Sequence, residues 1–352
     1  MTVKSTCRQC ETRYEKGSWN SKYCTEDCRK DFLSKKTKAQ SKYRQKNGEL
    51  WPTVRVAQPV TVRVPATRPS KNKLKVSLIL PDPQFGYRKV GKTLEPFHDE
   101  GALRLARLIG EYLRPDETIF LGDVLDLAPY GKYRQEPGFT DTVQPAIDRT
   151  YQELAVYSAL SKKVVFINGN HDIRLKRYIE DNAGSAASIH VADNGSDGKT
   201  PVFSIQNLLR FKELGIEHID QYPMGWYWIN KDLACIHGHV VKAAGKTASA
   251  LAKENHYSTI FGHIHRIETS YCTKHTAKGP VTDMAHSPGT LARVDNSVPG
   301  VHSSTNAEGV PSTYYQNWQQ GISVVYSNKD MFFLENIPFK NGTAFFDGKI
   351  FK

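Results

Sequence analysis

Five β-rich apolar runs in this chain each end in a short cluster of side chains that commonly bind metal ions. The runs, which predict strands, cover residues 75–80, 118–123, 164–169, 233–238 and 258–263. The clusters at their ends read Asp82-Pro83-Gln84, Gly122-Asp123, Gly169-Asn170-His171-Asp172, His237-Gly238-His239 and Gly262-His263-Ile264-His265. Because the ligands of α/β proteins gather at the carboxyl ends of strands, we expect all five clusters to line one pocket.

The spacing and the chemistry of these side chains indicate a site for two ions. Side chains two apart on an extended segment share a face, so Asp82 with Gln84, and His263 with His265, can each reach the pocket. Mixed Asp, Asn and His ligands suit Mn, Fe or Zn better than Ca or Mg. Two ions roughly 3.5–4 Å apart need a bridging carboxylate and several further ligands, and the clusters supply that number.

The clusters, taken in order, resemble the motifs of the calcineurin-like metallophosphoesterase family. The family pattern runs D-x-H, G-D-x-x-D, G-N-H-[DE], H and G-H-x-H, and this chain has DPQ, GDVLD, GNHD, HGH and GHIH. The resemblance spans about residues 82–265 and extends to HSPGTLAR (286–293), which looks like the family's Asn-Pro-Gly-Ser segment. Within the family, the chain looks like the repair exonucleases and like phosphoesterases encoded by bacteriophages. The resemblance implies a four-layer α-β-β-α sandwich. The order of elements agrees with a mixed α/β domain, because predicted helices at 98–113 and 145–161 alternate with the early strands.

The resemblance also implies a role for each residue of the clusters. Asp82 and His265 would hold one ion, and Asp123 would bridge it to the second. The remaining ligands of the second ion would be Asn170, His237 and His263. His171 would bind no metal but would protonate the leaving oxygen as a general acid, while both ions stabilise the charge that grows on phosphorus during in-line attack.

One residue departs from the family pattern. The first histidine of the family is Gln84 in this chain. An amide oxygen can bind a metal, but it is neutral and harder than imidazole. We therefore predict a first site that is weaker or less suited to zinc and that favours Mn. A site for a single metal, or a degenerate site, is the alternative.

Two acidic neighbours are expected to support the site from outside the metal ligands. Asp126, the last residue of GDVLD, is expected to orient a neighbouring side chain. Asp172 follows the predicted general acid His171 and is expected to fix its backbone or its tautomer.

Other polar and aromatic residues near the clusters carry open alternatives. His239 competes with His237 as a ligand, and the His-Gly pair favours His237. Arg174 or Arg177 would clamp a phosphate or form a surface ion pair. Four aromatic residues would stack on bases or, in the favoured interpretation, pack in the core: Tyr222, Trp226, Tyr227 and Trp228.

The N-terminal residues 1–34 contain two close cysteine pairs. Cys7 and Cys10 are followed, after a short loop, by Cys24 and Cys28. This spacing predicts a tetrahedral zinc site with four cysteine ligands, similar to treble-clef or ribbon zinc fingers in which the second pair opens a helix, with Thr25 as its cap. A module of this size needs a metal to fold. It would contact nucleic acid directly or, alternatively, form a knob for docking another protein.

The net positive charge of the chain comes from its N-terminal residues 1–73, because basic and acidic residues balance in the rest. The net charge is +12, and residues 1–73 hold 18 Lys and Arg against 6 Asp and Glu. We expect a basic helix at 35–50 and a Pro-rich linker at 51–72, then a catalytic domain at 74–340 and a C-terminal tail at 341–352. An arm of this charge is typical of a segment that binds nucleic acid, although a solubilising tail has the same composition.

The leading interpretation is a metal-dependent phosphodiesterase that acts on nucleic acid, with the zinc finger and the basic arm (residues 35–73) holding the polymer. Two alternatives stay open: a phosphomonoesterase on phosphoproteins or nucleotides, and a non-catalytic binding or assembly protein. The chain has no run of eighteen apolar residues and no secretory signal, so the prediction is a cytoplasmic protein without a membrane partner. A phage-encoded protein acting in the host cytoplasm fits the same pattern.

Overall fold

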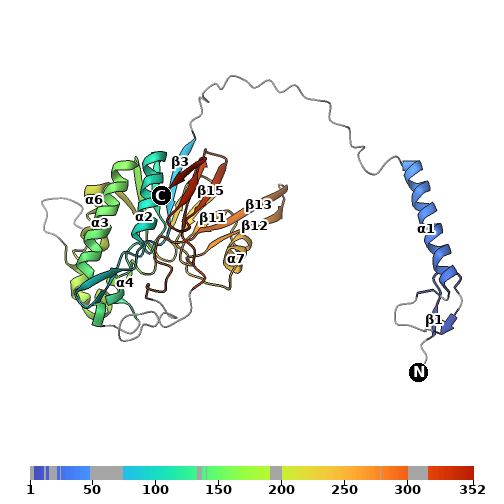
Figure 1. Cartoon of the computed structure of the whole chain (residues 1–352), viewed down its shortest axis with the longest axis horizontal. Coiled ribbons are helices and arrows are strands. Elements are labelled where there is room, and N and C mark those ends of the chain that lie inside the picture. Colours follow the sequence, from blue (N-terminus) through green and yellow to red (C-terminus); the bar gives the residue numbers. More distant parts are fainter. Residues whose placement is uncertain are drawn as a thin grey trace, which may run out of the picture. The chain divides into compact units, whose positions relative to one another are not determined.

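A computed structural model shows that the chain divides into two units, Met1–Ser70 and Lys71–Lys352 (Figure 1). The predicted linker at 51–72 lies outside the described residues. None of the helices in the described ranges is long and apolar enough to cross a membrane. The structure describes residues 4–11, 13–15, 22–23, 25–47, 74–132, 137–139, 141–190, 200–277, 279–299 and 316–352.

The first unit consists of a small hairpin followed by a long polar helix. Strand β1 (Lys4–Thr6) pairs antiparallel with β2 (Arg13–Glu15), and helix α1 covers Glu26–Asn47. The hydroxyl of Thr25 accepts a hydrogen bond from the backbone N–H of Cys28 at 3.2 Å, which confirms the predicted cap. The helix continues from the cysteine module through most of the basic stretch predicted at 35–50.

The second unit contains two large sheets, so the predicted mixed α/β class is confirmed. The six-stranded sheet has the order β15-β14-β3-β6-β7-β8, in which β3, β6, β7 and β8 are parallel. Its strands are β3 (Lys75–Leu80), β6 (Glu117–Phe120), β7 (Lys163–Ile167), β8 (Ile216–Ile219), β14 (Gly321–Ser327) and β15 (Phe332–Pro338). The five-stranded sheet has the order β12-β13-β11-β10-β9: β9 (Trp226–Trp228), β10 (Leu233–Ile236), β11 (Ser258–Phe261), β12 (Ile267–Thr276) and β13 (Gly279–Pro288). A separate ribbon pairs β4 (Tyr87–Val90) with β5 (Thr93–Pro96).

Helices cover the outer sides of the sheets, with α2 and α3 on one side and α7 on the other (Figure 1). The longer ones are α2 (Glu100–Leu113), α3 (Val143–Leu160), α4 (Arg174–Asn182) and α7 (Lys246–Glu254); the short ones are α5 (Ile205–Leu208), α6 (Phe211–Leu214) and the 3-10 turns Ala128–Tyr130, Pro137–Phe139 and Gly184–Ser188. The carboxylate of Asp99 caps α2 by accepting from Gly101 N and Ala102 N.

Apolar side chains on alternate positions of the strands form separate cores. On β3, Leu78 and Leu80 pack with α2 and α3, whereas Ile79 points into a second cluster shared by both sheets. Ile260 of β11 belongs to that second cluster. A third cluster joins Ala248 of α7 to the five-stranded sheet. The two sheets are thus held face to face, and the carboxyl ends of their parallel strands become neighbours.

Residues 341–352, predicted as a C-terminal tail, instead form a packed hairpin. Strand β16 (Ala344–Phe346) pairs antiparallel with β17 (Lys349–Phe351). Ala344 and Phe346 are buried in the same apolar cluster as α2, and the ring of Tyr112 on α2 lies 6.2 Å from that of Phe346 and 5.8 Å from that of Phe351. The segment is ordered because it completes the core beside α2.

Candidate metal centre

The ligand-type clusters meet at the carboxyl ends of five strands. Loops after β3, β6, β7, β10 and β11 carry them, in chain order. Two groups of ligand atoms each lie within 4.8 Å of one another: Asp123, His237 and His263 form one, and Asp82, Asp123 and His265 form the other. Because Asp123 belongs to both groups, its carboxylate is placed to bridge two ions.

The backbone at this centre adopts conformations that most residues avoid. Five of the predicted metal ligands have positive φ angles: Asp82 (43°), Gln84 (54°), Asp123 (47°), His263 (71°) and His265 (55°). A non-glycine residue in this region costs of the order of 1–3 kcal/mol, and such residues cluster at functional sites. The fold therefore holds these side chains in place at a cost in stability, as a site for ligands requires.

Glycines let the loops approach closely enough to make the centre. A Cβ atom on Gly169 would lie 2.1 Å from Oδ1 of Asp123, and a Cβ atom on Gly122 would lie 2.4 Å from Nδ1 of His237. Gly122 also has a φ of +91°, which favours glycine. Only residues without a side chain fit these two positions.

Backbone hydrogen bonds tie the loops to one another. The N–H of His171 donates to Oδ1 of Asp123 at 2.8 Å, and the N–H of His263 donates to Oδ1 of Asp82 at 2.9 Å. The hydroxyl of Thr290, in the segment 286–293, donates to the carbonyl oxygen of Asp82 at 2.8 Å. Each buried carboxylate is thereby held by a loop distant in sequence, which fixes the relative positions of the ligands.

Acceptor atoms face one another around His237. Its Nδ1 lies 2.8 Å from the carbonyl oxygen of Leu121, which can only accept, so Nδ1 carries the proton. In the neutral ring, Nε2 then carries a lone pair and is an acceptor. This atom lies 3.3 Å from Oδ2 of Asp123 and 3.2 Å from Oδ1 of Asn170. A cation shared by these three atoms, either a proton on Nε2 or a metal ion, would satisfy them.

Two buried oxygen atoms near Asp123 are available to bind a metal ion. Among the described residues, Oδ2 of Asp82 and Oε1 of Gln84 find no hydrogen-bond partner although both are buried. The amide nitrogen of Gln84 lies 3.2 Å from Oδ2 of Asp123 and 3.4 Å from Nε2 of His265. A half-turn of the amide would direct its oxygen toward these ligands. The donor set thus fits a pair of divalent ions, with Gln84 able to contribute.

The carboxylates of the centre attract positive charge, which agrees with a site for cations. Burial disfavours a charged Asp123, but His171 and His237 hold the pKa of this carboxyl well below its usual value. Burial also disfavours a charged His237, yet Asp123 and Asp82 raise its pKa to about 9. Burial and the charge of His237 lower the pKa of His263 to about 3. A metal ion binds an ionised carboxylate and a neutral imidazole, so Asp123 and His263 have the required forms, whereas a bound metal would displace the proton that the carboxylates hold on His237.

The predicted general acid lies at the edge of the centre. The side chain of His171 is 12% exposed, and its Nδ1 lies 3.0 Å from Oδ2 of Asp126. Arg174 donates to the carbonyl oxygen of Asp126 at 2.7 Å and lies 3.0 Å from Nε2 of His171. Arg174 is therefore not a surface ion pair, because it belongs to a largely buried trio with His171 and Asp126.

Asp172 was expected to fix the backbone or the tautomer of His171, but the backbone N–H of His171 donates to Asp123 and its Nδ1 faces Asp126. The carboxylate of Asp172 accepts from the N–H groups of Gly169 at 2.7 Å and Leu125 at 2.9 Å. It links the loop after β7 to the loop after β6. Burial, together with the nearby charge of Asp123, raises the pKa of Asp172 to about 7.

The structure also resolves the alternatives for the neighbouring residues. His239 is exposed, whereas His237 is buried in the centre. Tyr227 is buried in the core between the sheets, but Trp228 is 45% exposed. No sequence pattern pointed to Trp318, whose ring lies 4.4 Å from that of His265 in an edge-to-face arrangement.

Three cysteines of the first unit form a separate group of possible ligands. The sulfur atoms of Cys7, Cys10 and Cys28 lie within 4.8 Å of one another. Cys24, the fourth predicted ligand, lies outside the described residues. The three thiols fit a metal site that depends on the helix α1 for one ligand.

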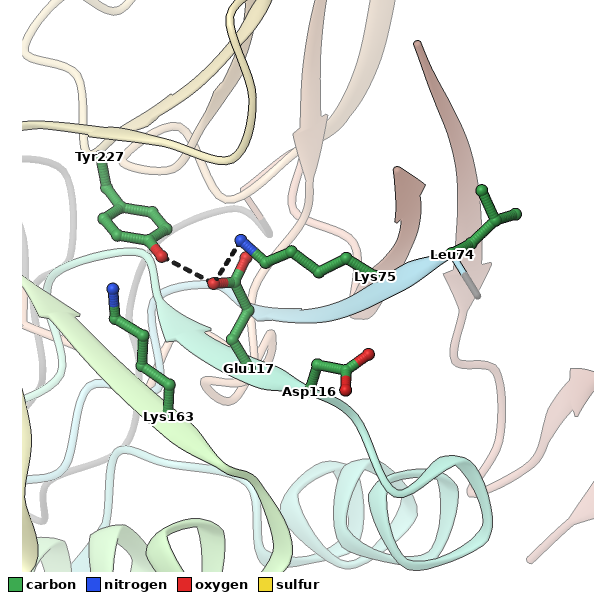
Figure 2. A pocket seen from close by; sticks show the side chains of 6 residues that line it. All are labelled: Leu74, Lys75, Asp116, Glu117, Lys163 and Tyr227. Carbon is green, nitrogen blue, oxygen red and sulfur yellow. Dashed lines mark hydrogen bonds and ion pairs between the residues drawn. The ribbon is translucent and has the colours of Figure 1, made fainter. Parts of the chain in front are cut away.

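A pocket of about 350 Å³ lies at the amino ends of β3, β6 and β7, at the opposite ends of these strands from the candidate metal centre (Figure 2). Figure 2 shows Glu117 there, directed at Lys75 and Tyr227. The Lys75 Nζ atom lies 2.8 Å from the carboxylate, and the Tyr227 hydroxyl donates to it at 2.6 Å. Since Tyr227 belongs to the other sheet, this bonded carboxylate joins the two sheets and is not a catalytic candidate.

Comparisons with known proteins give a fold likeness at low scores. No family model and no curated protein sequence match the chain. Similar solved structures include vacuolar protein sorting 29 from Cryptosporidium parvum, with 12% identity and a TM-score of 0.31 over 79% of this chain and 95% of that one. Yfce, a phosphoesterase from E. coli, has 11% identity and a TM-score of 0.29 over 74% of this chain and 98% of that one. The purple acid phosphatase PPD1 from yellow lupin seeds has 9% identity and a TM-score of 0.38 over 79% of this chain and 54% of that one.

Proposed function

We propose that the second unit is a phosphoesterase that uses two metal ions to hydrolyse phosphodiester bonds, with nucleic acid as its substrate. The observation that carries this proposal is the pair of ligand groups that share Asp123 at the carboxyl ends of the strands. Asp82, His265 and Gln84 would hold the first ion, and Asn170, His237 and His263 the second. The three apolar cores support the proposed α-β-β-α order of layers.

The chemistry is divided between the ions and the side chains. Two bound divalent ions, with Mn preferred, would supply Lewis acidity toward a phosphate and a water activated for attack. Nδ1 of His171 faces Asp126, and Nε2 accepts a hydrogen bond from the guanidinium of Arg174. Turning this guanidinium toward a bound phosphate would free Nε2, which, once protonated, would pass a proton to the leaving oxygen.

Turnover of simple esters tests the proposal. With Mn present, the full chain should hydrolyse bis(4-nitrophenyl) phosphate faster than 4-nitrophenyl phosphate, and it should cut labelled DNA or RNA. His171→Ala should lose about 100-fold or more in turnover and keep its metal content. Faster hydrolysis of the monoester would favour the phosphomonoesterase, and no hydrolysis of either ester would favour a binding protein.

We further propose that the first unit holds a structural zinc on Cys7, Cys10, Cys24 and Cys28 and directs the enzyme to a polymer. Support comes from the three gathered thiols and from the basic composition of the arm. Deleting residues 1–50 should leave hydrolysis of a small diester unchanged, weaken binding to long nucleic acid, and flatten its salt dependence. An unchanged affinity for the polymer would rule out this role.

A further inference from the structure

A cavity of about 250 Å³ lies beside the loop that carries Asn170 and His171. One wall is this same loop, through Asn168, Asp172 and Ile173. The other walls come from α4, from the turn Gly184–Ser188, from α5 with the residues before it, and from β8. In this wall, Asn168 lies two residues from Asn170 and Asp172 lies one residue from His171, and two residues span at most about 7 Å, so this wall adjoins the metal centre.

A neutral network of polar side chains forms one side of the cavity. Nε2 of His218 lies 2.9 Å from Oδ1 of Asn168, and Nδ1 lies 2.5 Å from the amide nitrogen of Gln206. These bonds place the ring proton on Nε2, and burial lowers the pKa of His218 to about 4, which keeps the ring neutral. The Asn168 amide also donates to the carbonyl oxygen of Asp220 at 3.2 Å. A primary amide has two N–H donors and two acceptor positions, so Asn168 and Gln206 have capacity for a ligand as well.

Apolar side chains form the opposite side. Ile173, Ile179 and Phe203 line the cavity. Ile173 is buried, whereas Phe203 is 43% exposed, so a face or edge of its ring is open to a flat partner. The lining also holds three acidic residues and one lysine, namely Asp172, Lys176, Glu180 and Asp220, so acidic groups outnumber basic ones. A flat, uncharged group with several hydrogen-bonding atoms fits such a lining, and an anion does not.

We propose that this cavity binds one nucleobase, that of the nucleotide joined to the phosphate at the metal centre. The proposal rests on the proposed function and names the part of the substrate that the enzyme recognises. Cavities that take drug-sized ligands measure roughly 300–1,000 Å³, so a space of about 250 Å³ suits a single base and excludes a longer segment. Stacking on Phe203 would accept any base, and the amides of Asn168 and Gln206 would choose among them.

Two esters with the same leaving group test the proposal in the full chain. They are thymidine 5′-(4-nitrophenyl phosphate) and methyl 4-nitrophenyl phosphate, of which one carries a whole nucleoside and the other a methyl group. Phe203→Ala removes the stacking surface, and Ala187→Leu fills the cavity from its wall. Each should raise KM for the thymidine ester about tenfold or more and leave KM for the methyl ester unchanged. Phe333→Ala, at a phenylalanine that is 64% exposed on β15, is the matched control and should change neither.

The outcomes separate the two proposals. Equal KM values for the thymidine ester in the wild type and in both variants would overturn base binding and leave the phosphoesterase intact. If the wild type hydrolyses neither ester, the proposed function fails, and calorimetric titration with thymidine and adenosine then decides the cavity by itself. Binding that Phe203→Ala weakens about tenfold supports the site, and no binding of either nucleoside contradicts it.

Discussion

Nδ1 of His171 lies 3.0 Å from Oδ2 of Asp126, in a contact between the loops after β7 and β6. Asp126 is fully buried, and the same carboxyl group receives Arg174. Asp126 thus sets the orientation of the imidazole and the position of the guanidinium together. These contacts support the interpretation that Asp126 orients a neighbouring side chain, and its role outside the metal ligands stays a prediction.

Replacing Asp126 with Asn should lower turnover about 10- to 100-fold and leave the metal content unchanged. The amide has the shape of the carboxylate but no charge to hold His171 and Arg174. The measurement is kcat on a small diester together with metal analysis of the same sample. A loss of metal equal to the loss of turnover would instead identify Asp126 as a ligand.

The metal preference of the first site should depend on Gln84. After chelation, Mn should restore the wild-type activity better than Zn does, because an amide oxygen is harder than imidazole. Gln84→His should raise the affinity for zinc about tenfold, which corresponds to about 1.4 kcal/mol. Titration of the metal-free protein with each ion measures this. The same ranking of ions in both proteins would show that Gln84 does not bind.

Gly169 should tolerate no side chain. A Cβ atom would lie 2.1 Å from Oδ1 and 2.3 Å from the backbone nitrogen of Asp123. Gly169→Ala should therefore lower the free energy of unfolding by about 1–3 kcal/mol and reduce metal binding. Gly184→Ala is the control, since no atom lies within 4 Å of its added Cβ. Equal denaturation midpoints for the two variants would contradict the crowding seen at Asp123.

Mild acid should destabilise the second unit through a buried histidine. Burial lowers the pKa of His286 to about 4, and Nδ1 and Nε2 bond to Thr269 and Ser323 at 2.8 and 2.9 Å. In the unfolded chain the imidazole of His286 is protonated below about pH 6.5, whereas in the folded chain it stays neutral to a much lower pH. The free energy of unfolding should therefore fall by about 2 kcal/mol for this residue between pH 7 and pH 5.

His286→Gln isolates this contribution, because it keeps a hydrogen-bonding side chain that does not titrate. Chemical denaturation at pH 7 and pH 5 should show a smaller loss of stability in the variant than in the wild type. Identical losses in the two proteins would mean that the acid sensitivity comes from other groups.

The strands that lead to the ligand-type clusters were predictable because each apolar run lies next to its cluster in sequence. KVSLIL leads directly to Asp82, and STIFGH leads directly to His263. The sequence could not show that Asp172 holds backbone groups of two loops, nor that Arg174 lies against His171. These contacts join loops after different strands and exist only in the folded chain.

Two other elements were missed for identifiable reasons. Strand β12 has the sequence IETSYCTKHT, in which polar residues occupy both faces, so it lacks the alternation that marks a strand. The C-terminal hairpin did have a signal. Asp347-Gly348 lies between AFF and KIF, and both residues have positive φ, as a two-residue hairpin turn requires.

The bridging role of Asp123 is the claim on which the function depends most. The full chain and its Asp123→Asn variant should be loaded with Mn, desalted, and measured by mass spectrometry of the metal content. The wild type should retain two Mn ions per chain that the variant loses, while the folded state, followed by circular dichroism, persists in both. Equal Mn content in the two proteins, or a wild type that retains none, would contradict the account.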